Sequence, residues 1–257
     1  MPRAHPLAPR IAAAMREATL ALGRHPTLGE VAEVAGFTCI DAGLGVSSAN
    51  VALPTAVAGL AMPALREVAA WFAARGINFR VDLPADAPSD LMAAAMTLGL
   101  RFRERQPVML LERVWPAPLP GELDVRPVAD DRDVQDFCAI DTLEFEDDPL
   151  LASIIAAARD APAVRLLTGF LEGRPVARIA AMLHGDLATL HSLYVHPAFR
   201  RRGLGTEMTL RVLALVRSEG AAAAALASTL AAVPLYERLG FQTIGATIVM
   251  GCDSPLP

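Results

Sequence analysis

The clearest hydrophobic pattern in this chain lies in residues 191–216. Leu193 and Val195 supply strand character, and Pro197 ends the strand because proline cannot donate to a hydrogen-bond ladder. After a short basic turn, apolar residues return at spacings of three and four: Leu204, Met208, Val212, Leu215 and Val216. This spacing predicts an amphipathic helix, so the segment is predicted to form a strand, a tight turn and a helix.

Similar patterns elsewhere predict strands that alternate with helices. Residues 77–83 alternate between apolar and polar side chains, which predicts a half-buried strand. Residues 63–75 predict a helix that begins with proline and is followed by glycine. Residues 164–195 predict a meander whose turns fall at 172–173 and 185–186. Strands flanked by helices in this way predict an α/β fold, an α+β mixed sheet with helices on both faces.

A proline-rich stretch divides the chain. Residues 115–127 contain four prolines and a glycine, which is typical of a linker that leads into a strand. We therefore predict an N-terminal domain at 1–115, a linker at 116–122 and a C-terminal domain at 123–257.

The two halves resemble each other weakly at an offset of 144 residues. Each has a helix that closes with a glycine, Gly76 in the first half and Gly220 in the second. Residues 56–58 carry no cation where residues 200–202 carry three arginines. The first half is therefore predicted to be a smaller, degenerate copy that packs against the second half, shapes its substrate site or mediates dimer contacts. Chance matching in a chain rich in alanine and leucine is the alternative.

Composition excludes several classes of function. The chain is 53% hydrophobic with a net charge of −5, so it has no general attraction to nucleic acid or to an anionic membrane. Three cysteines stand far apart and form no CxxC pair: Cys39, Cys138 and Cys252. They predict neither a metal site nor a disulfide framework, and they fit a reducing cytoplasm. Charged residues inside the first apolar run, such as Arg10 and Glu17, favour an amphipathic helix over a signal peptide or a membrane span.

The turn before the predicted helix carries candidate chemistry. Arg200, Arg201 and Arg202 precede Gly203 and Gly205. Glycines let the backbone approach a ligand closely, and the first N–H groups of a helix have no partner within the helix. A pyrophosphate can occupy that position, helped by the helix dipole and the arginines. The alternative is an ordinary strand-to-helix turn with solvated arginines.

This turn, together with the segment LYERLGF at residues 235–241, resembles the acyl-CoA-binding core of the GCN5-related N-acetyltransferases, the GNAT superfamily. The resemblance covers about residues 123–251. It implies a GNAT fold in the C-terminal half, with acetyl-CoA as cosubstrate. It implies a strand that splays from its neighbour and binds pantetheine through its main chain. It assigns contacts with acetyl-CoA to Leu193, Tyr194, Val195, Arg200, Arg201, Arg202, Gly203, Leu204, Gly205, Thr206 and Thr229. Thr229 stands where the family often has asparagine.

Tyr236 is the candidate general acid. In similar enzymes the tyrosine of this segment protonates the departing thiolate, and a phenol suits that role because its pKa of about 10 exceeds the value of about 8.5 for a thiol. The first half has Ala95 at the corresponding place. The alternative is a tyrosine that packs on its helix with its hydroxyl in water.

The candidate base is His191. It lies two residues before Leu193, which predicts that both side chains project from the same face of the sheet. The segment HSLYVH resembles the corresponding strand of the arylalkylamine N-acetyltransferases, where a histidine helps to deprotonate the amine. A half-buried structural histidine is the alternative. Three acidic residues are rival bases or attract a cationic amine: Glu144, Glu146 and Asp147.

These residues predict an N-acetyltransferase that moves an acetyl group from acetyl-CoA to a primary amine by direct attack. No activated serine or cysteine is visible in the sequence, which argues against a covalent intermediate. The acceptor is a small molecule or a peptide. Its identity, the acyl chain length and the oligomeric state stay open; a homodimer is plausible, although no motif supports one. The alternative is a non-catalytic acyl-CoA-binding protein with a regulatory or scaffolding role. Three arginines on an acidic chain do not predict nucleic-acid binding.

Overall fold

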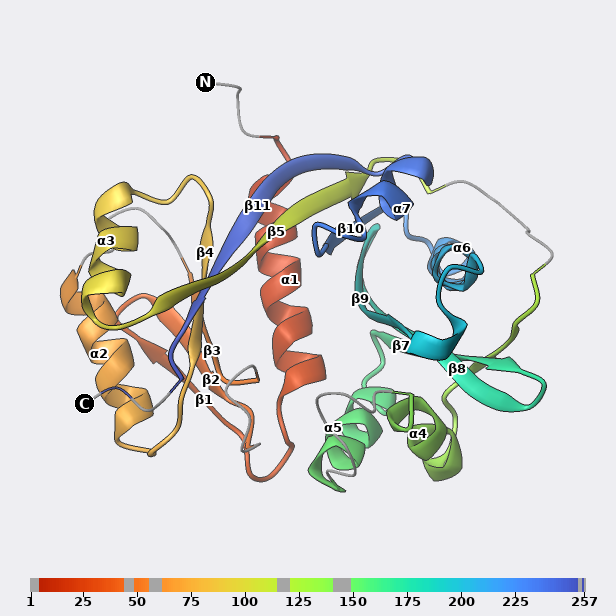
Figure 1. The fold of residues 1–257 in the computed structure, drawn as a ribbon, viewed down its shortest axis with the longest axis horizontal. Helices are drawn as coiled ribbons and strands as arrows, with labels where there is room; N and C mark the ends of the chain where they lie inside the picture. Colours follow the sequence, from red (N-terminus) through yellow and green to blue (C-terminus); the bar gives the residue numbers. More distant parts are fainter. Residues whose placement is uncertain are drawn as a thin grey trace. The chain divides into compact units, whose positions relative to one another are not determined.

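The computed structural model describes residues 5–43, 49–55, 62–114, 121–140, 149–253 and 256 (Figure 1). The chain divides into two compact units. Unit 1 contains Met1–Leu22 and Val108–Ile244, and unit 2 contains Gly23–Pro107 and Gly245–Pro257. Among the described residues, no helix is both long enough and apolar enough to cross a membrane.

Unit 1 is built on a mixed sheet with the strand order β5-β10-β9-β8-β7-β6. Its strands are β6 (Asp124–Pro127), β7 (Val164–Leu171), β8 (Arg174–His184), β9 (Leu187–Val195), β10 (Ala223–Ala227) and the end of β5 (Arg101–Leu111). Its helices are α1 (Ala8–Gly23), α4 (Asp131–Cys138), α5 (Pro149–Arg159), α6 (Leu204–Ser218) and α7 (Val233–Arg238), with a short 3-10 helix at Pro197–Phe199. Strand β10 runs parallel to β9 and antiparallel to β5.

Helices cover both faces of this sheet. On one face, Met208 and Val212 of α6 pack with Ile179 of β8 and Leu190 of β9. On the other face, α4 and α5 cover Ala180 of β8. Helix α1 covers strands β5, β9 and β10 through a separate cluster of apolar residues: Ile11, Ala14, Leu110, Leu187 and Ala225. The predicted mixed sheet between helical layers is therefore present in unit 1.

Unit 2 has the strand order β1-β2-β3-β4-β11-β5, with residues 101–107 of β5. Its strands are β1 (Glu30–Val34), β2 (Phe37–Asp41), β3 (Val51–Pro54), β4 (Arg80–Pro84) and most of β11 (Gln242–Gly251), and its helices are α2 (Met62–Ala73) and α3 (Ser89–Thr97). The helix predicted at 63–75 is present as α2. Strand β4 begins three residues later than the strand predicted at 77–83 and ends one residue beyond it. Phe72 of α2 stacks on Phe79 in the centre of this core, with 4.3 Å between ring centroids.

The compact units do not follow the linear boundaries that we predicted at 1–115, 116–122 and 123–257. Helix α1 and the end of β5 belong to unit 1, whereas most of β11 belongs to unit 2, where Val81 of β4 pairs with Met250. The reason is that a strand can pair with one from a distant part of the chain, as β11 does with β4. Residues 116–120 of the predicted linker lie outside the described residues.

Both halves show the same order of elements from their third-last strand onward. The order is β3-α2-β4-α3-β5 in the first half and β9-α6-β10-α7-β11 in the second, and the first two strands of each series pair in parallel. Residues 44–48 and 56–61, which the predicted repeat includes, lie outside the described residues. The repeat stays a prediction, and this shared order of elements supports it.

Candidate functional site

Strand β9 extends well beyond the end of its neighbour β10. Their parallel pairing runs from Leu187, opposite Ala223, to Leu190, opposite Leu226, whereas β9 continues to Val195. The N–H of His196 donates to the carbonyl of Val176 on β8 at 2.9 Å. Because backbone groups alternate in direction along a strand, Leu193 and Val195 direct theirs toward the side of β10. Among the described residues, this end of β9 therefore offers backbone donors and acceptors to a ligand, inside the sheet rather than at its outer edge.

A β-bulge at Ser192 changes which face each side chain of β9 occupies. Ser192 has φ +52, and the register between β8 and β9 shifts between Arg178 and Ala180. Leu193 packs on the core beneath α6. His191 pairs with Ala180, whose side chain lies in the cluster under α4 and α5. The prediction that His191 shares a face with Leu193 is therefore wrong, because the extra residue of the bulge breaks the two-residue period.

The glycine-containing turn has the backbone of an anion site. Arg201 has φ +66, and Gly203 has φ +82 immediately before α6. The first α-helical bond of α6 runs from the N–H of Glu207 to the carbonyl of Gly203 at 3.0 Å, which leaves the N–H groups of residues 204–206 without a partner within the helix. Leu204 itself is buried, and Thr206 is half-buried. Unpartnered N–H groups at the positive end of a helix favour phosphate.

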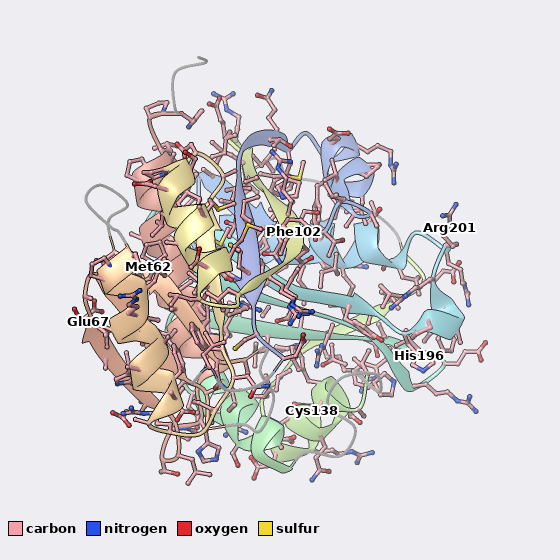
Figure 2. All side chains as sticks on the ribbon, turned by 60° about the vertical axis from the view of Figure 1, so that its left-hand side comes forward. Met62, Glu67, Phe102, Cys138, His196 and Arg201 are labelled. Atoms are coloured by element: carbon pink, nitrogen blue, oxygen red, sulfur yellow. The ribbon has the colours of Figure 1, made fainter. Side chains whose placement is uncertain are left out.

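The three arginines of the turn have different surroundings. Arg200 donates from Nε to the carbonyl of Val195 at 2.9 Å and lies over the Tyr194 ring at 5.3 Å. Arg202 pairs with Glu122 at 2.5 Å between Nη2 and Oε2. Arg201 is exposed and projects from the turn (Figure 2), and no ion pair of its guanidinium is recorded among the described residues. Arg201 is thus the cation most directly available to an anion.

Two acidic residues beside the turn escaped the sequence analysis. Glu207, in the first turn of α6, is 8% exposed, and its carboxylate accepts from the N–H groups of Glu122 at 3.1 Å and Leu123 at 3.2 Å. Gly121 is required there, because a Cβ on it would lie 1.7 Å from Oε1 of Glu207. The signals available in the sequence were an acidic residue in the first turn of the α6 region and a glycine, Gly121, shortly before the strand that became β6. These contacts hold Glu122 where it meets Arg202.

Gly205 marks the place where three elements meet. A Cβ at Gly205 would lie 3.2 Å from Leu235 of α7, and 3.8 Å from both Leu193 and Val195 of β9. The end of β9, the first turn of α6 and the helix that carries Tyr236 therefore converge. A Cβ at position 205 would be tight against Leu235 and in ordinary contact with both β9 side chains, so little room for a larger side chain remains there.

Tyr236 lies in the core next to this point. It is 6% exposed, and its ring meets Phe241 edge-on with centroids 5.6 Å apart. Burial raises the pKa of Tyr236 to about 12, so its hydroxyl stays protonated at neutral pH. Thr229 is exposed after the end of β10, and its carbonyl accepts from the Ser228 hydroxyl and the Ala232 N–H.

His191 is half-buried, and its Nε2 atom is buried without a hydrogen-bond partner among the described residues. Burial, and then the charge of His184, lowers the pKa of His191 to about 4, so the ring is neutral at pH 7. The buried hydroxyl of Tyr194, on the same face, has no partner among the described residues either. The rival bases Glu144, Glu146 and Asp147 lie outside the described residues.

Comparison with known proteins gives a family for this region. The model of the acetyltransferase (GNAT) family matches residues 130–241, which include β9, the turn, α6 and Tyr236. The search of curated proteins finds no match. The family match points to acetyl transfer, and it confirms the predicted resemblance for the matched residues.

Several solved structures share the fold over nearly the whole chain. A GCN5-related N-acetyltransferase from Kribbella flavida has a TM-score of 0.70 and 19% identity, covering 96% of both chains. A GCN5-related N-acetyltransferase from Sphaerobacter thermophilus has a TM-score of 0.64 and 14% identity, covering 99% of this chain and 95% of that one. A tandem GNAT protein from the clavulanic acid biosynthesis pathway has a TM-score of 0.62 and 11% identity, covering 97% and 94%. These likenesses confirm the predicted α/β fold class.

Proposed function

Because residues 130–241 form a domain of the acetyltransferase (GNAT) family, we propose that this chain is an N-acetyltransferase that moves an acetyl group from acetyl-CoA to a primary amine. The observation that carries the proposal is the convergence at Gly205. There the unpaired end of β9, the phosphate-binding turn and the helix of Tyr236 lie within side-chain contact of one another.

Acetyl-CoA would be held mainly by backbone groups. The N–H groups of residues 204–206 and the exposed Arg201 are suited to the pyrophosphate. The N–H groups of Leu193 and Val195 are suited to the amides of pantetheine, whereas the carbonyl of Val195 already accepts from Arg200. Because Arg200 is turned toward β9, we assign it to the strand end rather than to a phosphate.

The reaction needs one proton acceptor and one proton donor. The amine nitrogen attacks the thioester carbon, the C–S bond breaks, and the amine loses a proton. His191 would take that proton, although burial lowers its pKa to about 4 and so makes it a weaker base than a free imidazole. Tyr236 is protonated at pH 7 and would give its proton to the departing thiolate.

The first test is calorimetric titration with acetyl-CoA. We expect micromolar binding by the wild-type chain and its loss in the double variant Arg202→Ala/Gly203→Asp. Gly185→Asp is a matched control, because Gly185 and Gly203 both have positive φ and neither has an atom within 4 Å of an added Cβ. No binding by the wild-type chain would overturn the acetyl-CoA assignment.

The second test is turnover, followed by release of free thiol. The panel of primary amines comprises spermidine, lysine, kanamycin and a peptide with a free N-terminus. Tyr236→Phe should lower kcat while acetyl-CoA binding persists. Binding without turnover on any amine would favour the alternative, a non-catalytic acyl-CoA-binding protein.

A further inference from the structure

A series of hydrogen-bonded side chains runs from helix α1 into the sheet of unit 1. Oε2 of Glu17 lies 2.9 Å from Nδ1 of His184 on β8, and Nε2 of His184 lies 3.0 Å from the hydroxyl oxygen of Thr189 on β9. The Glu17 side chain is 62% exposed, that of His184 is 9% exposed, and Thr189 is fully buried. This series of side chains therefore leads from solvent to the interior of the sheet.

The buried end of this series, Thr189, lies beside the candidate base, His191. Thr189 and His191 are two residues apart on β9, before the bulge, so both side chains project from the same face. His184 is close enough to His191 for its charge to be felt there. A proton on His191 Nε2 has no acceptor among the described residues, whereas a proton on His184 Nδ1 faces a carboxylate.

We propose that Thr189, His184 and Glu17 form a proton exit path that clears the proton from His191 after each turnover. This inference rests on the proposed function. His191 gives up the proton it took from the amine, across one water molecule, to the Thr189 hydroxyl oxygen. That hydroxyl gives its own proton to Nε2 of His184, and Nδ1 of His184 gives its proton to Glu17, which exchanges it with solvent. Each bond that breaks is replaced by a new N–H or O–H bond, and no other reactant is needed.

This path assigns a chemical task to a helix outside the matched residues 130–241. Arg10 supplies the control, because it also joins α1 to the end of β8 and the turn before β9. It donates to the carbonyl of His184 and to the carboxylate of Asp186, and no bond to the His184 ring is among its contacts. Arg10→Gln should loosen α1 and leave the path intact. Glu17→Gln and Thr189→Val interrupt the path with little change in side-chain volume.

The test combines turnover with a readout that does not need turnover. With any amine of the panel that reacts, Glu17→Gln and Thr189→Val should lower kcat by at least about ten-fold, while the KM for acetyl-CoA and the activity of Arg10→Gln stay near wild type. High concentrations of imidazole buffer should restore kcat in these two variants and not in Tyr236→Phe. Loss of activity without buffer rescue, or equal loss in Arg10→Gln, would overturn the proposal.

Ring nitrogen NMR tests the same path in the absence of substrate. The chain has five histidines, so the His184 and His191 resonances can be assigned by single substitutions. Thr189→Val should shift both resonances at pH 7, and Glu17→Gln should shift that of His184, whereas Arg10→Gln should leave both in place. An unchanged His191 resonance in Thr189→Val would refute the path, even if no amine reacts and the proposed function itself fails.

Discussion

Replacing Glu122 by glutamine tests how the arginine turn meets a phosphate. Arg202 and Glu122 pair at 2.5 Å, and the backbone of Glu122 is fixed by the Glu207 carboxylate. An arginine that turns to a phosphate must first leave this partner. Glu122→Gln removes the competing charge and keeps the backbone N–H that binds Glu207. We therefore expect the variant to bind acetyl-CoA more tightly than the wild type.

The geometry sets the size of this gain. The side chains of Arg202 and Glu122 are 43% and 56% exposed, and such exposed pairs contribute about 0.2–1 kcal/mol. Removing the competition should lower the Kd for acetyl-CoA by about 1.4- to 5-fold. Calorimetric titration at low ionic strength measures the difference, and it should shrink at high ionic strength because salt screens exposed charges.

Asp124→Asn is the matched control for Glu122→Gln. It removes the same charge two residues away, where Asp124 pairs with Arg126 rather than with an arginine of the turn. Equal gains in the two variants would show a general charge effect instead of local competition. Binding by Glu122→Gln that is equal to or weaker than wild type would refute the reasoning.

Four further predictions test the site and the core. Tyr236→Phe should lower kcat by about 10²–10⁴-fold with an unchanged Kd for acetyl-CoA, and wild-type activity should not fall through ionisation of Tyr236 below pH 10, since its pKa is about 12; stopped-time assays across pH check both. Gly205→Val should destabilise the fold by about 1–3 kcal/mol and weaken acetyl-CoA binding, because the added Cβ already meets Leu235 at 3.2 Å; urea unfolding and calorimetry measure these losses. The pKa of His191 falls from 6.5 in the unfolded chain to about 4 in the folded one, so the unfolded state binds the proton first and stability should drop as the pH falls from 6.5 toward 4; urea unfolding of His191→Gln should show a smaller drop. Met208→Ala, at a fully buried position on the inner face of α6, should cost about 2–5 kcal/mol, measured as a shift of the urea midpoint.

Local signals in the sequence predicted the turn and its helix. Pro197 ends the strand, Gly203 supplies a positive φ, and apolar residues at helical spacing begin at Leu204, so each step depends on neighbouring residues alone. The family match over residues 130–241 agrees with this local reasoning. The residues assigned to acetyl-CoA and to catalysis stay predictions.

Features that depend on distant pairing could not be predicted in the same way. The bulge at Ser192 needs knowledge of how β9 registers with β8, and without it His191 was placed on the wrong face. The ion pair between Arg202 and Glu122 joins residues 80 positions apart and has no periodic signal. The predicted domain boundaries were likewise placed from the proline-rich stretch alone. That stretch does not indicate which strands pair with one another.

The place of β11 has a consequence for synthesis on the ribosome. Strand β4 spans residues 80–84, yet the strand that completes its edge is residues 247–251, far later in the sequence. Because a chain emerges from its N-terminus, the sheet of unit 2 cannot close until residue 251 has been made. Until then β4 presents an open edge, which is the kind of surface that pairs wrongly with other chains. Protection of nascent chains by chaperones should therefore matter more for this protein than for one whose N-terminal domain closes on its own residues.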